Sequence, residues 1–168
     1  MSFKSINLND FEKFNPFNLI GNEWLLITSG EKDNFNTMTA SWGTVGVLWN
    51  KNIATCFVRP QRYTFKFLEE NEIFSLSFFD KEYKDALRIC GTKSGRDCDK
   101  ISQAGLTPIF NEKAPYFKES KMTLICKKIY AQYIDPKCMI DEDLESNYKL
   151  KDYHKMFVGE IIKCLVED

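Results

Sequence analysis

The sequence predicts a mostly β protein with peripheral helices, folded as a closed or split antiparallel barrel. Several short segments rich in β-branched and aromatic residues follow one another without the regular alternation of strand and helix that a doubly wound parallel sheet requires. Aromatic residues make up 14% of the chain, and closure of the sheet would remove the exposed edges of such strands. A length of 168 residues suits one domain, so we expect residues 1–168 to form a single domain.

Six segments are expected to form strands, because each is dense in apolar or β-branched residues. They cover residues 24–28, 36–43, 53–58, 73–79, 122–127 and 156–166. The first 18 residues carry four phenylalanines and are expected to form an irregular or short helical lead-in, with Phe3, Phe11, Phe14 and Phe17.

Three segments are expected to form helices. In residues 63–71 aromatic and apolar residues recur three and four positions apart, and Pro60 lies where a helix start tolerates its missing N–H. Residues 82–90 and 96–104 are the other two, and Gly105 is expected to cap the last one. Residues 136–151 are acidic and polar without a clear period, which predicts a loop or lid.

Composition disfavours several classes of protein. Lys and Arg number 23 against 24 Asp and Glu, and this balance disfavours a general nucleic-acid binder. No apolar run approaches the ~20 residues that a membrane-spanning helix needs, and the first fifteen residues lack the apolar region of a signal peptide. We therefore expect a cytoplasmic protein.

The six cysteines include no CxxC pair and the chain has one histidine, so we expect no metal site and mostly buried free thiols.

Two basic patches could bind an anion. Arg59 and Arg62 bracket the expected start of the helix at residue 63, where free backbone N–H groups and the helix dipole favour negative charge. The second patch is the segment 93–96 with Lys100 one turn later, at the expected start of another helix. An arginine side chain matches phosphate oxygens with two parallel donors. Either patch alone could instead be a solvated basic turn with a helix cap.

Residues 36–42 are unusually rich in small and hydroxyl side chains, which would let backbone N–H groups approach the edge of a flat heteroaromatic ligand. The alternative is an ordinary strand with a threonine-rich outer face.

The chain contains no GxGxxG, GxxxxGK[ST] or GxSxG motif. With His154 as its one histidine and no nucleophile elbow, hydrolase chemistry is poorly supported.

Four segments in order carry a family resemblance: residues 36–43, 58–64, 94–100 and 152–154, the last followed by Gly159-Glu160-Ile161. Together they resemble the flavin reductase-like, FMN-binding split-barrel family, from about Asn22 to the C-terminus. The resemblance implies an antiparallel split β-barrel of Greek-key type. It also implies a homodimer that binds FMN non-covalently near the subunit interface.

Carried over residue by residue, the resemblance implies a set of cofactor contacts. The edge of the flavin ring would meet Asn36, Thr37, Met38, Thr39, Ala40 and Ser41, largely through backbone N–H groups. The neighbouring strand, with Cys56, Phe57 and Val58, would lie against the ring and the ribityl chain. The phosphate end would meet Arg59, Arg62 and Thr64, with Ser94, Arg96 and Lys100 as further candidates, and Tyr63 also belongs to the expected cofactor-binding set. On this basis Arg59→Ala is expected to weaken FMN binding with little effect on folding.

His154 matches the family's late histidine and is the candidate catalytic residue. Its ring could contact flavin or substrate or deliver a proton near neutral pH, or it could be a structural group that hydrogen-bonds across a dimer. Trp42 and Trp49 are expected to be core or interface anchors. Tyr148 and Tyr153 could cover the flavin ring or lie in the surrounding loop.

The resemblance implies an oxidoreductase in which NADH or NADPH passes a hydride to flavin, and electrons go on to free flavin, ferric iron or another acceptor. The cofactor would carry the chemistry, which agrees with the absence of a catalytic triad. A second hypothesis is an FMN-binding electron-transfer module without its own nicotinamide site. A third, a barrel without cofactor, would leave both basic patches without a ligand.

Overall fold

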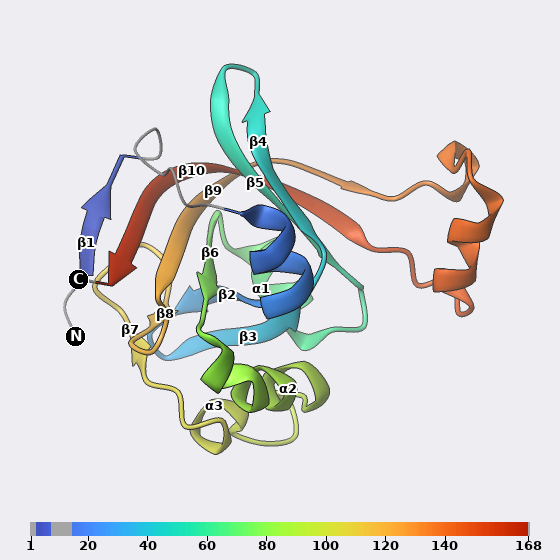
Figure 1. Ribbon diagram of the computed structural model, residues 1–168. Helices are drawn as coiled ribbons and strands as arrows, with labels where there is room; N and C mark the ends of the chain where they lie inside the picture. Colours follow the sequence, from blue (N-terminus) through green and yellow to red (C-terminus); the bar gives the residue numbers. More distant parts are fainter. Residues whose placement is uncertain (1–2, 8–14, 168) are drawn as a thin grey trace.

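The computed structural model describes residues 3–7 and 15–167 of the chain. Its main element is an eight-stranded antiparallel sheet that curls into a split barrel (Figure 1). The strand order is β3–β2–β6–β9–β10–β5–β4, and β1 pairs with the C-terminal part of β10. The strands are β1 (Phe3–Ile6), β2 (Leu25–Glu31), β3 (Asn34–Ala40), β4 (Gly43–Leu48), β5 (Lys51–Val58), β6 (Ile73–Phe78), β9 (Met122–Tyr133) and β10 (Lys155–Glu167); β7 (Pro108–Ile109) and β8 (Tyr116–Phe117) form a separate small sheet.

Helices lie around the barrel. They are α1 (Tyr63–Glu70), α2 (Lys84–Thr92) and α3 (Lys100–Gln103), with a π-helical segment η2 (Phe17–Glu23) and short 3₁₀ turns η3 (Lys81–Tyr83), η4 (Pro136–Cys138) and η5 (Glu142–Tyr148). None of the helices in the described part of the chain is long and apolar enough to cross a membrane.

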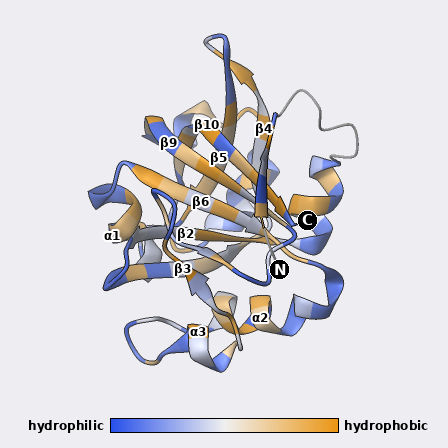
Figure 2. Ribbon diagram, turned by 90° about the vertical axis from the view of Figure 1, so that its left-hand side faces the viewer, coloured by the Kyte–Doolittle hydropathy of each residue, from blue (hydrophilic) through white to orange (hydrophobic). Residues whose placement is uncertain are grey.

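The main core fills the barrel, and a second apolar layer lies outside it. Strands β2, β3, β5, β6, β9 and β10 send side chains inward, with Leu68 of α1 among them. Leu26 points the other way and packs under α2 with Leu87 and Cys90. Both faces of β2 are therefore covered, which explains its continuous apolar sequence. In Figure 2 the barrel strands carry much of the hydrophobic colouring.

Strand β10 is long enough to pair with three partners. It pairs with β9 along nearly its whole length and with β5 from Lys155 to Glu160. Its register against β9 shifts between Val158 and Gly159, which bends the strand around the barrel. Glycine is required there, because a Cβ at residue 159 would lie 2.7 Å from both Phe74 Cζ and Cys126 Cβ.

Two segments project from the barrel. The β4–β5 hairpin ends in a tight turn at Trp49 and Asn50, whose φ angles of 52° and 57° are typical of a type I′ turn. The second projection, which we call the arm, is residues 134–153 between β9 and β10 and contains η4 and η5 (Figure 1). Both carry exposed large apolar side chains, among them Trp49 on the hairpin and Ile140 on the arm.

The predicted fold class is confirmed, and all six predicted strands are present. Strands β1 and β4 and the two short strands β7 and β8 were not predicted. The helix predicted for residues 82–90 begins as η3, and α2 runs to Thr92. Pro60 lies in the turn before α1 rather than at its first residue. Part of the expected lead-in, with Phe11 and Phe14, lies outside the described residues; residues 17–23 form η2, as a short helical lead-in would.

The helix predicted for residues 96–104 is wrong in its first half. Residues 95–97 form a turn, and α3 begins only at Lys100, where the Asp99 carboxylate accepts a hydrogen bond from the Ser102 N–H. Asp97 and Asp99 favour turns and caps over a helix interior, so the helix begins after them.

Candidate functional site

A polar recess of about 290 Å³ lies where β3, β5, α2 and the start of β10 meet. It is lined by Met38, Thr39, Ala40, Ser41, Trp42, Phe57, Arg59, Arg62, Gly91 and His154. Eight of these ten residues were expected from the sequence to lie near a flavin or its reaction. Strand β3 ends the sheet, so one edge of its backbone has no partner strand within the sheet. Its free N–H and C=O groups can therefore bind the polar rim of a flat ligand.

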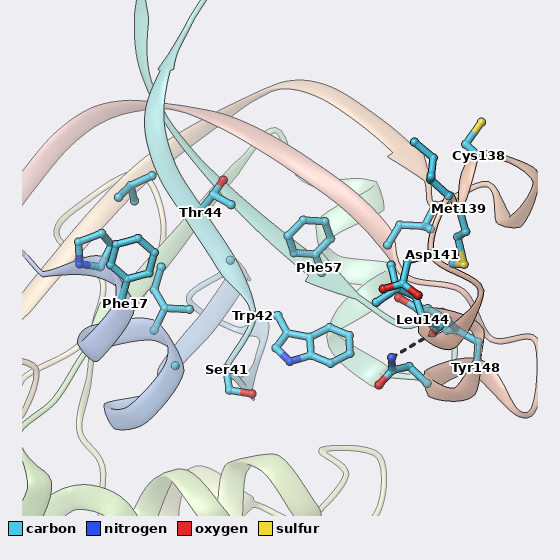
Figure 3. Close-up of a pocket in the computed structure, with 18 residues that line it drawn as sticks. Phe17, Ser41, Trp42, Thr44, Phe57, Cys138, Met139, Asp141, Leu144 and Tyr148 are labelled. Carbon is cyan, nitrogen blue, oxygen red and sulfur yellow. Dashed lines mark hydrogen bonds between the residues drawn. The ribbon is translucent and has the colours of Figure 1, made fainter.

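A larger apolar chamber of about 970 Å³ adjoins the recess. Residues from η2, the start of β4 and the arm line it, and it shares Ser41, Trp42 and Phe57 with the recess. Figure 3 shows Trp42 and Phe57 pointing into the space between η2 and the arm. Asp141 is the one charged residue among those that line it. A molecule in the chamber would therefore lie next to whatever occupies the recess.

Arg62 is the cation of the recess without an acidic partner. It is the N-cap residue of α1, and its side chain donates to the Gly91 carbonyl at 2.8 Å. Within residues 3–7 and 15–167 no carboxylate forms a salt bridge with it. Burial lowers the pKa of its guanidinium, which still leaves the group charged near neutral pH. Its remaining N–H groups can bind an anion.

Arg59 has its charge compensated within the protein. Its guanidinium lies 2.5 Å from the Asp152 carboxylate and donates to the Asn147 carbonyl at 2.9 Å. Gln61 also donates to Asp152. These hydrogen bonds hold the pKa of Asp152 below its usual value, so the carboxylate is ionised. Arg59 therefore joins β5 to the arm and offers less charge to a ligand than Arg62.

His154 is buried at the wall of the recess. Its Nδ1 lies 3.0 Å from the Tyr148 hydroxyl, and its ring centre lies 5.0 Å from that of Trp42. Burial, and then the charge of Arg59, lower its pKa to about 4. The ring is therefore neutral at pH 7, and delivery of a proton from a cationic imidazole, one of the roles considered for it, is not supported.

The second basic segment packs on the start of α1. Gly95 lies against Asn36 and Tyr63, and the Arg96 guanidinium stacks 4.8 Å above the Tyr63 ring. The Asn36 amide donates to the Thr64 hydroxyl at 2.8 Å. Ser94 stands in the same loop and accepts from the Arg96 N–H. Asn36, Tyr63, Thr64, Ser94 and Arg96 therefore form a second group, beside the recess rather than among the residues that line it.

Lys100 does not offer its charge to a ligand in this structure. Its side chain is buried, with 3% of the residue exposed, and its ammonium donates to the carbonyls of Cys90 and Lys93. Burial lowers its pKa to about 8. Because α3 begins at Lys100, the side chain turns back to cap the end of α2 instead of extending beside Arg96.

Three further predicted residues point their side chains away from the recess. Cys56 and Val58 face the barrel core, and the Thr37 hydroxyl bonds to Thr28 and to the Ile27 carbonyl. In a strand, alternate side chains face opposite sides, so only some of residues 36–41 and 56–58 can face one ligand. Only the backbone of these three can contribute there.

Several residues of the site were not predicted from the sequence. Gly91 carries no local signal in the sequence, and its position beside Thr39 depends on how α2 packs. Asp152 belongs to one of the four family-like segments, but its pairing with Arg59 joins residues 93 positions apart.

The described residues contain no group of three or more metal-ligating side chains.

Comparison with known proteins places these features in a family. The profile of the "Flavin reductase like domain" matches residues 17–168. The chain belongs to the flavin reductase-like family. An uncharacterised protein of Pyrococcus abyssi is 28% identical over 141 residues, which span 82% of this chain and 69% of that protein.

Solved structures with the same fold include two that are similar over most of this chain. One is an FMN-binding domain of a flavin reductases-like enzyme from Shewanella baltica, at 15% identity and a TM-score of 0.70, covering 98% of this chain and 77% of that one. The other is a flavoredoxin from Methanosarcina acetivorans, at 24% identity and a TM-score of 0.68, covering 87% and 69%. At these identities they show the split-barrel fold.

The close packing of Gly95 leads to a testable prediction. A Cβ at residue 95 would lie 2.3 Å from Asn36 Oδ1, and the Asn36 amide is itself held by the Thr64 hydroxyl, so Gly95→Ala forces the loop away from strand β3 and is expected to cost about 1–3 kcal/mol of stability. Urea unfolding measures the effect. Gly46→Ala, in a strand where a Cβ meets nothing within 4 Å, is the control and should change stability little. Equal effects of the two substitutions would contradict the packing argument.

Proposed function

We propose that this protein is an FMN-binding oxidoreductase of the flavin reductase type, which accepts a hydride from NADH or NADPH and passes electrons to an acceptor. Membership of the flavin reductase-like family supports the proposal. The observation that carries it is the recess itself, in which the free edge of β3 faces the unpaired guanidinium of Arg62.

The residues of the recess fit the chemical groups of FMN. A flavin ring is flat and bears hydrogen-bond donors and acceptors along one edge, which suits the free backbone of residues 38–41. A phosphate is a dianion, which suits Arg62 at the N-terminus of α1. When bound, FMN would supply the centre that takes two electrons from a nicotinamide and gives them up again.

The chain itself supplies binding, orientation and exclusion of water. His154 is neutral and hydrogen-bonded, so it can hold a polar atom of a ligand but carries no charge at neutral pH. Trp42 and Phe57 place apolar surface at the junction of the recess and the chamber. This division of labour requires no protein nucleophile.

The alternative function is an electron-transfer module that holds FMN but has no nicotinamide site of its own. The similarity to a flavoredoxin supports it. The two functions differ in one property, which is whether reduced nicotinamide alone reduces the bound flavin.

A visible spectrum followed by anaerobic addition of NADH and then NADPH separates the two functions. We expect the protein, purified or reconstituted with FMN, to show a two-banded yellow spectrum that one of the nicotinamides bleaches within seconds. A yellow spectrum that persists would favour the electron-transfer module. A protein that binds no FMN would contradict both.

The anion role assigned to Arg62 predicts a large effect on affinity. Arg62→Gln removes a charge-assisted contact of ~1.5–3 kcal/mol and should raise the FMN dissociation constant by about tenfold to a hundredfold, measured by fluorescence titration. Arg88→Gln, which removes an exposed arginine paired only with Asp85 on the same helix, is the control. An Arg62→Gln protein that folds and binds FMN with unchanged affinity would rule out this role.

We also propose that the protein works as a homodimer, which the exposed apolar side chains of η2, the hairpin and the arm support. Phe17 is 87% exposed, Val47 73% and Ile140 99%, and such a set is costly to leave in water.

Sedimentation equilibrium should give twice the 19.6 kDa mass of one chain. Ile140→Asp should weaken the association by about tenfold or more, since it places a charge in an apolar contact. A wild-type protein that sediments as single chains at micromolar concentration would contradict the proposal.

A further inference from the structure

Two side chains just after β5 fasten the arm to the barrel: the Arg59 guanidinium makes most of the contacts, and Gln61 adds a hydrogen bond to Asp152. Arg59, just after β5, forms an ion pair with Asp152 and donates to the Asn147 carbonyl, so it contacts two separate points of the arm. Its central carbon also lies 5.2 Å from the centre of the Tyr148 ring, within the range of a cation–π contact. The position of Tyr148 therefore depends on Arg59.

Tyr148 in turn holds His154. Both residues are buried, and the Tyr148 ring also packs against Tyr153 with 4.8 Å between ring centres. The Tyr148 hydroxyl lies 3.0 Å from Nδ1 of His154, whose ring meets Trp42 as well. His154 lines the recess and its Nδ1 is engaged with the arm, whereas its Nε2 has no hydrogen-bond partner among the described residues, which leaves Nε2 as the ring nitrogen available to a ligand.

The direction of this hydrogen bond follows from the charges around it. The charged groups that act on His154 are Arg59 and Asp152; burial and Arg59 oppose a positive imidazole, so the ring is neutral and has one N–H and one acceptor nitrogen. Burial raises the pKa of Tyr148, so its hydroxyl keeps its proton. A cation over the ring draws electron density from the phenol and favours its role as donor.

We infer that Arg59, acting through Tyr148, fixes His154 as the tautomer with its proton on Nε2, so that the recess presents a histidine N–H donor to its ligand. Arg59 and Tyr148 are positioning residues in this arrangement. The ligand atom that fits is a hydrogen-bond acceptor, such as a carbonyl oxygen of a flavin or of a carbonyl substrate. The identity of that ligand rests on the proposed function, but the arrangement of the protein groups does not.

The inference can be tested on the protein without flavin, because the chain has one histidine and its imidazole ¹⁵N signals need no assignment. The two ring nitrogens have well-separated shifts that depend on which one carries the proton. At pH 7 we expect one dominant species protonated on Nε2. Tyr148→Phe removes the donor to Nδ1 and should give a mixture of tautomers.

Two substitutions of Arg59 and one control substitution test its role. Arg59→Gln should loosen the tautomer preference and raise the pKa of His154 by about one unit or more, because a nearby cation is lost while Asp152 stays. Arg59→Lys keeps a cation that can still pair with Asp152 and should restore the wild-type pKa in part. Arg88→Gln, on the exposed face of α2, is the matched control and should leave the signals unchanged.

Three outcomes would overturn the inference. The first is a wild-type histidine protonated on Nδ1. The second is a set of His154 signals that neither Tyr148→Phe nor Arg59→Gln alters; where one of these variants does not fold, unaltered signals in the other have the same consequence. The third is an Arg59→Gln protein whose His154 signals match wild type while its FMN affinity falls about tenfold, since Arg59 would then act on the phosphate. Failure to bind FMN in every variant and in wild type would contradict the proposed function alone.

Discussion

The antiparallel register between β5 and β10 is the constraint on which the site depends. Lys155 pairs with Val58, so the residues beyond this pair also face one another, His154 beside Arg59 and Asp152 beside Gln61. A slip of one residue would move the whole set to the opposite faces of the strands. The Gly159 bend and the shared pairing of β10 with β9 prevent that slip, because the buried side chains of β10 fit only one register.

This register gives two arginines of one short segment opposite electrostatic situations. Arg59 stands opposite the arm and meets the Asp152 carboxylate, whereas Arg62 starts α1 and meets only a backbone carbonyl. A cation that is already paired contributes to positioning more than to ligand binding, since a ligand would have to compete with the internal carboxylate. The two arginines are only three residues apart. Their electrostatic surroundings differ because Arg59 directly follows the strand β5, whereas Arg62 is the N-cap residue of the helix α1.

The strands of the barrel could be predicted because burial imposes a dense apolar pattern on them. Strand β4 was not predicted because most of its residues are exposed. Its sequence therefore lacks the regular alternation of buried apolar and exposed polar residues that identifies a strand. The small and basic residues at the ends of β3 and β5 predicted one site there, and the structure brings several of them together in the recess. The contact of Arg59 with Asp152 could not, because it depends on a register set over 90 positions. The surroundings of Lys100 were not predicted for a local reason, since the Asp99 cap starts the helix at Lys100, about one turn later than the predicted start at Arg96.

The positive charge of Arg62 lies at the recess and the negative charge of Asp141 lies at the chamber, and this separation favours one orientation of a charged ligand. At one end Arg62 offers an uncompensated cation at a helix start. The charge of Arg59 is paired with that of Asp152, and His154 is neutral, so these residues add little net charge to the wall of the recess. At the other end the chamber has a single charged lining residue, the acidic Asp141. For a molecule with an anionic tail and a neutral ring, these charges favour the orientation that places the tail at Arg62 and the ring beside Trp42 and Phe57. The reverse orientation would bring the anion toward Asp141 and away from the Arg62 guanidinium.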